Sequence, residues 1–441
     1  MIEKVLSKSD DGYGYNVILN YVFRLAGIFF GLICVRITLG YLGVNLYALW
    51  VTITSVISWM NSGDLGIGNG LRNELAKAYG EGDTLKQKLL IKTAIGCLTK
   101  VAAVVFCIII ILCEIFFKLE ILDEAVRMPM YIMAVFFCIN LVLGVSQSVA
   151  FSYQKSWLNS MTSCAIQLFS IIMIFILQVL EVNEDLTLFA VVNGLCTTIP
   201  NIILILILKS RDIKIFELNK IEKGSGYARG LIMNTGIKFF GMQLCGVVIY
   251  STDNLIINKL FNGEMVTKYS IITKVYDTGT GLFGVLLVVL WSAVTYHIAQ
   301  HDYNWVKNKV RQLSVIGCIF AVGVLFVSVF FNQIARIWIG QGVMHYETEL
   351  IALFGIYCVM SAFSAIYANV LNGMGIVKLQ LILVFVEAVL NIPLSILFAK
   401  YCNMGIFGVK LATFLCTAVS SVAVTVQAVI VLTSLSKSPA S

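Results

Sequence analysis

The chain has 441 residues, of which 59% are hydrophobic and 12% are charged, and its formal net charge is +7. Soluble domains contain about 25% charged residues, so this composition excludes a soluble globular protein and predicts an all-α polytopic membrane protein. The positive charge does not indicate a nucleic-acid partner, because the Lys and Arg residues lie in short connections between apolar runs and form no continuous stripe.

Runs of about 20 apolar residues, the length that crosses a bilayer as a helix, recur about twelve times along the chain. The predicted spans lie near residues 14–42, 44–65, 89–117, 129–153, 156–180, 186–208, 231–258, 266–297, 311–334, 347–372, 377–399 and 405–434. We expect two six-helix lobes, residues 1–208 and 231–441, joined by a polar cytoplasmic linker at 209–230. An even number of spans returns the chain to its starting side, so the lobes would be related by a pseudo-two-fold axis along the membrane normal.

Charge in the connections predicts the orientation of the chain. Basic residues concentrate after the even-numbered spans and near both termini, where Lys4, Lys8 and Lys437 lie. The opposite connections are short and acidic, as at residues 120–124 and 181–185. The positive-inside rule therefore places both termini in the cytoplasm.

Cations within the predicted spans indicate a binding site, because a buried charge is costly unless it faces a polar interior. The first span carries Asn20, Arg24 and Gly27 at the same spacing at which the seventh carries Asn234, Lys238 and Gly241. Arg24 lies about 14 Å inside its span at ~1.5 Å per residue, too deep to reach the membrane surface comfortably. We predict a cationic, substrate-binding cavity for an anion such as phosphate, formed by Arg24, Lys238, Arg36, Lys274, Asn20 and Asn234.

Other charged residues of the spans leave more than one interpretation open. Asp253, Asp277 and Glu387 are candidates for binding a coupling ion, and each could equally be a counter-ion for a cation in the cavity wall. Lys274 and Asp277 lie at i, i+3 and could neutralise each other. For Arg36, Lys100 and Lys410, which lie within reach of span ends, the simpler interpretation is that their side chains extend to the membrane surface.

The sequence offers no catalytic motif. It contains no Walker A sequence, no HExxH and no GxSxG, so an enzyme is not expected. His297 and His301 lie at i, i+4 without a third ligand, so no metal site is predicted. The twelve cysteines form no CxxC pair, and nearly all lie in apolar runs as small hydrophobic residues.

A polar, glycine-punctuated segment, DLGIGNGLRNELA at residues 64–76, follows the second span. Apolar residues recur after it at helical spacing, which predicts a short amphipathic helix on the cytoplasmic surface. The glycines loosen the end of the span, so we expect a cytoplasmic gate or hinge formed by Asp64, Gly66, Gly68, Gly70 and Arg72. Arg72 would then lie near the headgroups of the inner leaflet.

This segment, with the number of spans and the linker between the halves, resembles the Wzx-type O-antigen flippases of the multidrug/oligosaccharidyl-lipid/polysaccharide (MOP) exporter superfamily. The resemblance implies a MATE-like fold in the bacterial inner membrane that works by alternating access. The implied substrate is an undecaprenyl-pyrophosphate-linked oligosaccharide, carried from the cytoplasmic to the periplasmic leaflet, with Na⁺ or H⁺ as coupling ion and no other cofactor. Implied partners are membrane lipids and other membrane proteins of polysaccharide assembly.

Two alternatives remain open. A drug/cation antiporter of the same superfamily would need a cavity dominated by carboxylates, whereas the ionisable residues of these spans are mostly basic. A membrane-embedded polysaccharide polymerase would need a large loop with catalytic residues, and the connections between the spans are short.

Overall fold

The computed structural model describes residues 13–59, 63–119, 124–182, 185–210, 224–261, 263–339 and 346–435. Within these ranges the chain is almost entirely helical and contains no strand. The described residues include eleven helices that are long and apolar enough to cross a membrane. The predicted all-α, polytopic fold is confirmed.

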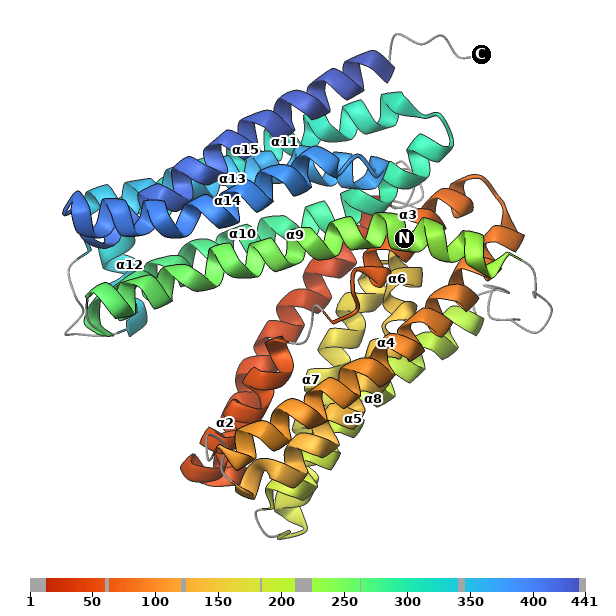
Figure 1. Ribbon diagram of the computed structural model, residues 1–441, viewed down its shortest axis with the longest axis vertical. Helices are drawn as coiled ribbons and strands as arrows, with labels where there is room; N and C mark the ends of the chain where they lie inside the picture. Colours follow the sequence, from red (N-terminus) through yellow and green to blue (C-terminus); the bar gives the residue numbers. More distant parts are fainter. Residues whose placement is uncertain are drawn as a thin grey trace, which may run out of the picture. The chain divides into compact units, whose positions relative to one another are not determined.

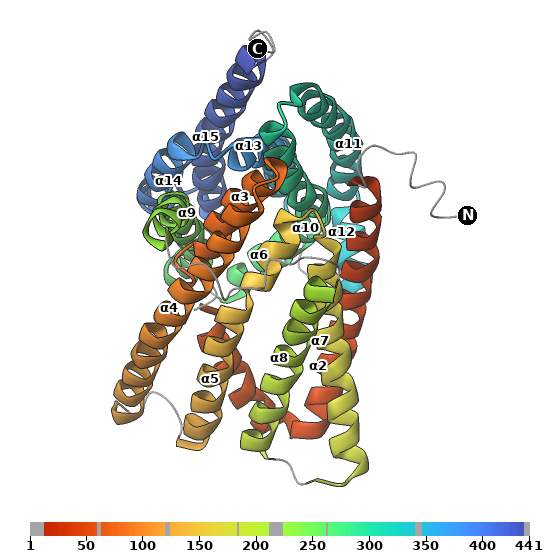
Figure 2. The ribbon, with the colours of Figure 1, turned by 90° about the vertical axis from the view of Figure 1, so that its right-hand side faces the viewer.

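The chain forms two compact units, residues 1–237 and 238–441. The first contains α2 (Tyr13–Trp59), α3 (Ile67–Gly80), α4 (Thr84–Lys118), a 3₁₀ turn (Glu124–Val126), α5 (Arg127–Leu143), α6 (Val145–Ser152), α7 (Trp157–Val179), α8 (Leu186–Ser210) and the start of α9 (Ser225–Leu260). Figure 2 shows α5, α7 and α8 running side by side in this unit. The predicted first and second spans are two segments of α2, which is broken at Gly43, where φ is 65° and ψ is 173°.

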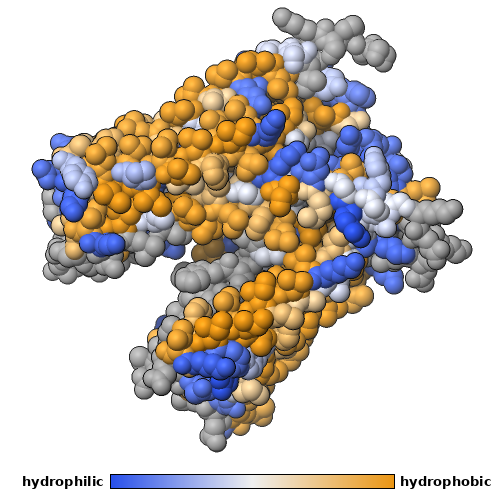
Figure 3. All heavy atoms as spheres, in the orientation of Figure 1, coloured by the Kyte–Doolittle hydropathy of each residue, from blue (hydrophilic) through white to orange (hydrophobic). Residues whose placement is uncertain are grey.

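The second unit continues from the rest of α9. It contains α10 (Gly263–Ala299), α11 (Tyr303–Val329), α12 (Phe331–Ile339), α13 (Thr348–Met374), α14 (Lys378–Ile396), a π-helical turn (Leu397–Tyr401) and α15 (Gly405–Leu435). Helices α13, α14 and α15 pack side by side (Figure 1). Hydrophobic residues cover most of the visible helix flanks in both units (Figure 3), as expected for surfaces that face lipid.

Helix α9 crosses the boundary between the units at residue 237. Its first turns belong to the core of the first unit, because Ala228 and Ile232 are buried in one cluster with Ile67 and Leu71 of α3. The predicted lobe boundary at residues 230 and 231 falls within this packed start of α9 and stays a prediction.

Candidate functional site

The glycine-rich segment forms a capped turn at the start of α3. The Asp64 carboxylate accepts hydrogen bonds from the backbone N–H groups of Gly66 and Gly68, both at 3.0 Å. Gly66 has φ of 74°, a left-handed conformation that favours glycine. At Gly68 a Cβ atom would lie 2.9 Å from Asp64 Oδ2. The structure thus gives Asp64, Gly66 and Gly68 a local folding role, and their proposed role in a gate remains a proposal.

The third glycine of the segment lies where α3 crosses α9. A Cβ atom on Gly70 would lie 2.3 Å from the carbonyl oxygen of Ile232, and one on Gly236 would lie 2.8 Å from the carbonyl oxygen of Gly66. Helix α3 also packs against α4 and α6. The predicted short amphipathic helix is present at these residues. Its predicted position at the surface was wrong, because α4, α6 and α9 enclose it on several sides.

Arg72 shows the same difference. Its side chain was expected near lipid headgroups, but the residue is only 5% exposed, and its guanidinium lies 4.3 Å from the ring centroid of Phe151. Burial lowers the pKa of Arg72 to about 9, which leaves the group cationic at neutral pH. The backbone carbonyl of Arg72 accepts a hydrogen bond of 3.0 Å from Ser152. Arg72 therefore joins α3 to α6 inside the first unit.

Glycines of the first span pack α2 against α7. Gly27 faces the backbone of Cys164, and Gly31 faces Gln167. Asn20 lies on the same side and is buried, where it donates to Ser156 Oγ at 2.9 Å and accepts from Ser160 Oγ at 2.7 Å. Asn20 was predicted to bind substrate, but its hydrogen-bonding groups are used in this packing. The Arg24 side chain remains exposed.

In the predicted seventh span, the residues at the matching positions have surroundings that differ from those in the first span. Asn234 is exposed whereas Asn20 is buried, and Lys238 is half-buried whereas Arg24 is exposed. Gly241 packs against Leu381 of α14. Arg36 and Lys274 are exposed. The matched sequence spacing therefore does not produce matched environments within the two units.

A network of uncharged polar side chains lies inside the first unit. Asn201 donates to Asn140 Oδ1 at 3.0 Å, and Asn140 donates to Thr198 at 2.9 Å. Gln147 donates to Asn201 at 3.2 Å. These groups satisfy one another across α5, α6 and α8, which is how polar side chains stabilise helix packing in a membrane.

The second unit contains a partly open polar cavity of about 480 Å³. Its walls come from α9, α10, α13 and α15, and three charged side chains, Asp253, Asp277 and Lys410, line it. Five aromatic residues also line it, namely Tyr269, Tyr276, Phe283, Phe354 and Tyr357. A cavity with convergent polar groups and aromatic walls is the usual form of a small-molecule site.

Asp253 is held firmly at this cavity. Its Oδ2 accepts a 2.6 Å hydrogen bond from the Tyr269 hydroxyl, and both carboxylate oxygens lie within 3.3 Å of the Thr413 hydroxyl. Asn391 in turn donates to Thr413 at 2.9 Å. Asp253 is 6% exposed, so these donors compensate for its removal from water.

Lys410 was expected to extend to the membrane surface, and this prediction was wrong. The residue is 6% exposed and its Nζ lies 3.5 Å from the ring centroid of Tyr357 and 4.4 Å from that of Phe354. The reason is its position in the second turn of α15, on the side that faces the cavity. No aspartate of the described residues forms an ion pair within 4.0 Å of its ammonium.

Asp277 is exposed to the cavity, and no described residue donates a hydrogen bond to its carboxylate. The possible ion pair with Lys274 is not formed within 4.0 Å in the described structure. The cavity therefore presents an ammonium and a carboxylate that are not paired with each other.

Glu387 lies outside this cavity, on the buried side of α14. It is 7% exposed, and its Oε1 has no hydrogen-bond partner among the described residues. Glu387 is thus a carboxyl group deep in the unit with one unused oxygen.

The sequence contained a signal for the cavity that hydropathy did not reveal. Polar and small residues of α10 recur at i, i+4, i+8, i+11 and i+15, on one side of the helix, as Tyr269, Thr273, Asp277, Thr280 and Gly284. All five line the cavity. Tyr357 and Thr413 give no comparable signal, because only tertiary packing brings α13 and α15 to the same place.

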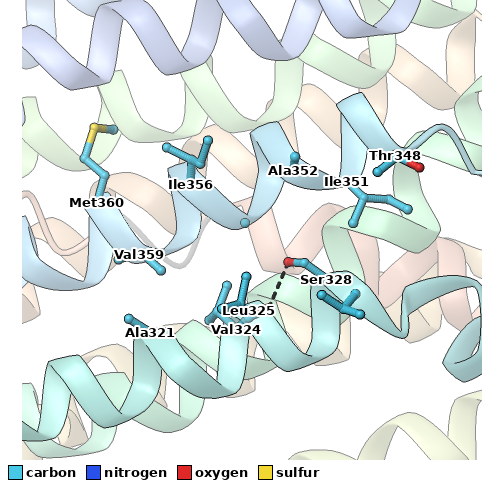
Figure 4. Close-up of a pocket in the computed structure, with 12 residues that line it drawn as sticks. Ala321, Val324, Leu325, Ser328, Thr348, Ile351, Ala352, Ile356, Val359 and Met360 are labelled. Carbon is cyan, nitrogen blue, oxygen red and sulfur yellow. Dashed lines mark hydrogen bonds between the residues drawn. The ribbon is translucent and has the colours of Figure 1, made fainter.

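An apolar groove of about 590 Å³ lies between α11 and α13 on the other side of α13 (Figure 4). Ser328 is its main polar group and donates to the carbonyl of Val324 at 2.8 Å. The Tyr276 hydroxyl lies 2.7 Å from Ser328 Oγ and also lines the polar cavity. Helix α13 and Tyr276 therefore separate an apolar groove from a charged cavity.

Comparison with solved structures identifies the fold of the chain. The chain matches a multidrug resistance MATE family transporter of the MOP superfamily, in its outward-facing conformation, with a TM-score of 0.80, 13% identity and 96% of both chains covered. It also matches a mutant of a MATE transporter of Vibrio cholerae with a TM-score of 0.74, 15% identity, and 96% and 98% coverage of the two chains. The chain has the MATE transporter fold.

Among proteins of known sequence, the chain is similar to O-antigen transporters. A protein of Yersinia pseudotuberculosis named for O-antigen export is 22% identical, with 89% of this chain and 91% of that protein covered. A protein of Salmonella typhimurium named as an O-antigen transporter is 21% identical, with 84% and 85% covered. No family model matches the chain. The resemblance to O-antigen exporters that residues 64–76 predicted is confirmed.

Proposed function

We propose that the chain is a flippase that carries an undecaprenyl-pyrophosphate-linked oligosaccharide from the cytoplasmic to the periplasmic leaflet by alternating access. The observation that carries the proposal is the alignment of O-antigen transporters along 84–89% of the chain. The transporter fold supports it, because lobes around a central path expose a site to each side in turn. Catalysis is not part of the proposal.

The pyrophosphate needs cations that are not neutralised within the protein. Arg24, Arg36, Lys238 and Lys274 have no ion-pair partner within 4.0 Å in the described part of the chain. They remain the proposed contacts of the headgroup, and Asn234 is proposed as a further contact.

We propose that Glu387, in preference to Asp253 and Asp277, binds the coupling ion. Asp253 is already held by Tyr269 and Thr413, whereas Glu387 Oε1 is buried and has no hydrogen-bond partner in the part of the chain that the structure describes. A buried carboxyl group of this kind is suited to gaining and losing a proton or to binding Na⁺ as the transporter changes conformation. Gln at position 387 keeps the shape and removes the charge, so Glu387→Gln should abolish the dependence of transport on an imposed ion gradient.

The proposed setting is the inner membrane, with both termini in the cytoplasm and other membrane proteins of polysaccharide assembly as partners. The test is complementation of a bacterial strain that lacks its own O-antigen flippase. The chain should restore surface polysaccharide and move lipid-linked intermediates from the cytoplasmic to the periplasmic leaflet. Intermediates that remain on the cytoplasmic side at normal expression of the chain would contradict the proposal.

An organic-cation antiporter is a second candidate, favoured by the fold of the multidrug transporter and by the two carboxylates of the cavity. This candidate predicts that expression of the chain lowers accumulation of tetraphenylphosphonium in cells. The flippase predicts no change in its accumulation.

A further inference from the structure

The polar cavity of the second unit has the size of a ligand site. Its volume of about 480 Å³ lies within the ~300–1,000 Å³ typical of small-molecule sites. A single water molecule occupies only ~30 Å³, so a bare ion would fill little of this space. A coupling ion alone therefore does not account for the cavity.

The cavity offers hydrogen-bond donors and acceptors that the protein does not use. The Lys410 ammonium is a donor with no hydrogen bond or ion pair to a described residue, and it contacts the rings of Tyr357 and Phe354. Among the described residues, none donates a hydrogen bond to the Asp277 carboxylate, and none is a hydrogen-bond partner of the buried Ser361 Oγ. Hydroxyl groups both donate and accept, so a polyhydroxylated ligand can satisfy all three.

The charge of the cavity selects among ligands. Two carboxylates and one ammonium give it a formal charge of −1, which disfavours a phosphate or an acidic sugar by repulsion. An organic cation would be drawn to the carboxylates, but Lys410 already lies 3.5 Å above the Tyr357 ring, the position that such a cation would take. A neutral ligand meets neither obstacle.

Aromatic side chains that are held in place by packing on one another complete the wall of the cavity. Tyr276 stacks on Phe354 with ring centroids 5.9 Å apart, and Phe283 stacks on Phe320 at 5.1 Å. Tyr276, Phe283 and Phe354 line the cavity. A pyranose has C–H groups on its faces and hydroxyls around its edge, so it can lie against aromatic walls while polar groups bind its edge.

We infer that this cavity is a subsite for one neutral sugar ring of the transported glycan. Lys410 donates to ring or hydroxyl oxygens, and Asp277 accepts from hydroxyl groups. The inference rests on the proposed flippase function, and it separates recognition of the sugar from the cations proposed for the pyrophosphate. Discrimination against acidic sugars comes from the excess negative charge of the cavity.

The test uses the full chain in lipid vesicles and two probes with the same undecaprenyl pyrophosphate. One carries a neutral oligosaccharide with a terminal glucose, and the other has glucuronate in place of that glucose. Flux of both probes is measured for Asp277→Asn, which brings the cavity to a formal charge of 0, and for Lys410→Met, which brings it to −2. Glu349→Gln and Lys259→Met are matched controls, because both residues are exposed and neither lines the cavity.

Each cavity variant should lower the flux of the neutral probe about tenfold, the usual effect of losing a hydrogen bond to a charged group. The ratio of glucuronate to neutral flux should rise about tenfold in Asp277→Asn and fall in Lys410→Met, whereas the controls keep the native ratio. A purely structural role would not move the ratio in opposite directions.

Two results would overturn the inference. One is an unchanged ratio in both cavity variants while the native chain transports the probes. The other is efflux of tetraphenylphosphonium that Asp277→Asn abolishes, which would make the cavity an organic-cation site. A native chain that moves neither probe and does not complement the flippase-deficient strain would instead refute the proposed function itself.

Discussion

The close crossing of α3 and α9 makes Gly70→Ala a sharp test of the structure. The added Cβ would lie 2.3 Å from the Ile232 carbonyl oxygen and 3.1 Å from the backbone nitrogen of Gly236. Carbon–oxygen contacts between neighbouring backbones are usually about 3.3–3.6 Å. The two helices would therefore have to separate by about 1 Å at this point, because both of these contacts are to backbone that cannot rotate away.

Overpacking of this kind typically costs about 1–3 kcal/mol. An exposed helical glycine gives the opposite effect, since alanine in place of glycine stabilises a helix by about 0.5–1 kcal/mol. Gly96 of α4 supplies this control, because no atom lies within 4 Å of its added Cβ. The two substitutions should thus differ by about 1.5–4 kcal/mol, the sum of these ranges.

The measurement is the free energy of unfolding of the purified chain in lipid–detergent micelles, for the native chain, Gly70→Ala and Gly96→Ala. Gly236→Ala should resemble Gly70→Ala, because its Cβ would lie 2.8 Å from the Gly66 carbonyl. Equal stability of Gly70→Ala and Gly96→Ala would refute the crossing and, with it, the anchoring of the start of α9 on α3.

Three further substitutions test other parts of the structure. Asp253→Ala removes the acceptor of the Tyr269 and Thr413 hydroxyl groups and should lower the free energy of unfolding by about 1–3 kcal/mol. Asp253→Asn keeps one acceptor oxygen and should lower it less, so equal losses in the two variants would contradict the stabilising role of these hydrogen bonds. Asp64→Ala removes the acceptor of two N–H groups at the start of α3 and should lower the free energy of unfolding by about 0.5–2 kcal/mol in the same assay. The comparison is Asp83→Ala, which removes the exposed side chain that caps α4. Burial raises the pKa of Glu74, so the contribution of its protonated carboxyl group to the free energy of unfolding is full below the usual pKa of a Glu and is lost as pH rises through the raised value. Glu74→Gln should therefore be more stable than the native chain at pH 7 and equal to it in acid. A constant difference in stability between pH 4 and 7 would show that the carboxyl group does not titrate as described.

Hydropathy was sufficient to predict the helical membrane fold, because about 20 apolar residues can cross a bilayer only as a regular element with satisfied backbone groups. The resemblance in residues 64–76 also predicted the class of relatives. The physical reason for that motif needed the structure, since the partner of Gly70 is Ile232, far along the chain.

The site residues were harder to predict for the same reason. Lys410 lies near the start of α15, and sequence position alone favoured a side chain that reaches the surface; packing of α10 and α13 places it in a cavity. Asn20 was predicted to bind substrate from its helical spacing, yet Ser156 and Ser160, well over a hundred residues away in sequence, use its hydrogen bonds. Charge within a span predicts importance, and tertiary contacts decide which role each charge has.

The central claim is that the chain itself moves a lipid-linked glycan across a bilayer. The most direct measurement is made on the purified chain in sealed vesicles loaded with undecaprenyl-pyrophosphate-linked oligosaccharide in the inner leaflet, with the appearance of the glycan in the outer leaflet followed by binding of an added lectin. The flippase account predicts that glycan appears with time in vesicles that contain the native chain and not in empty vesicles. Equal lectin binding in both, with the chain folded and inserted, would contradict the account.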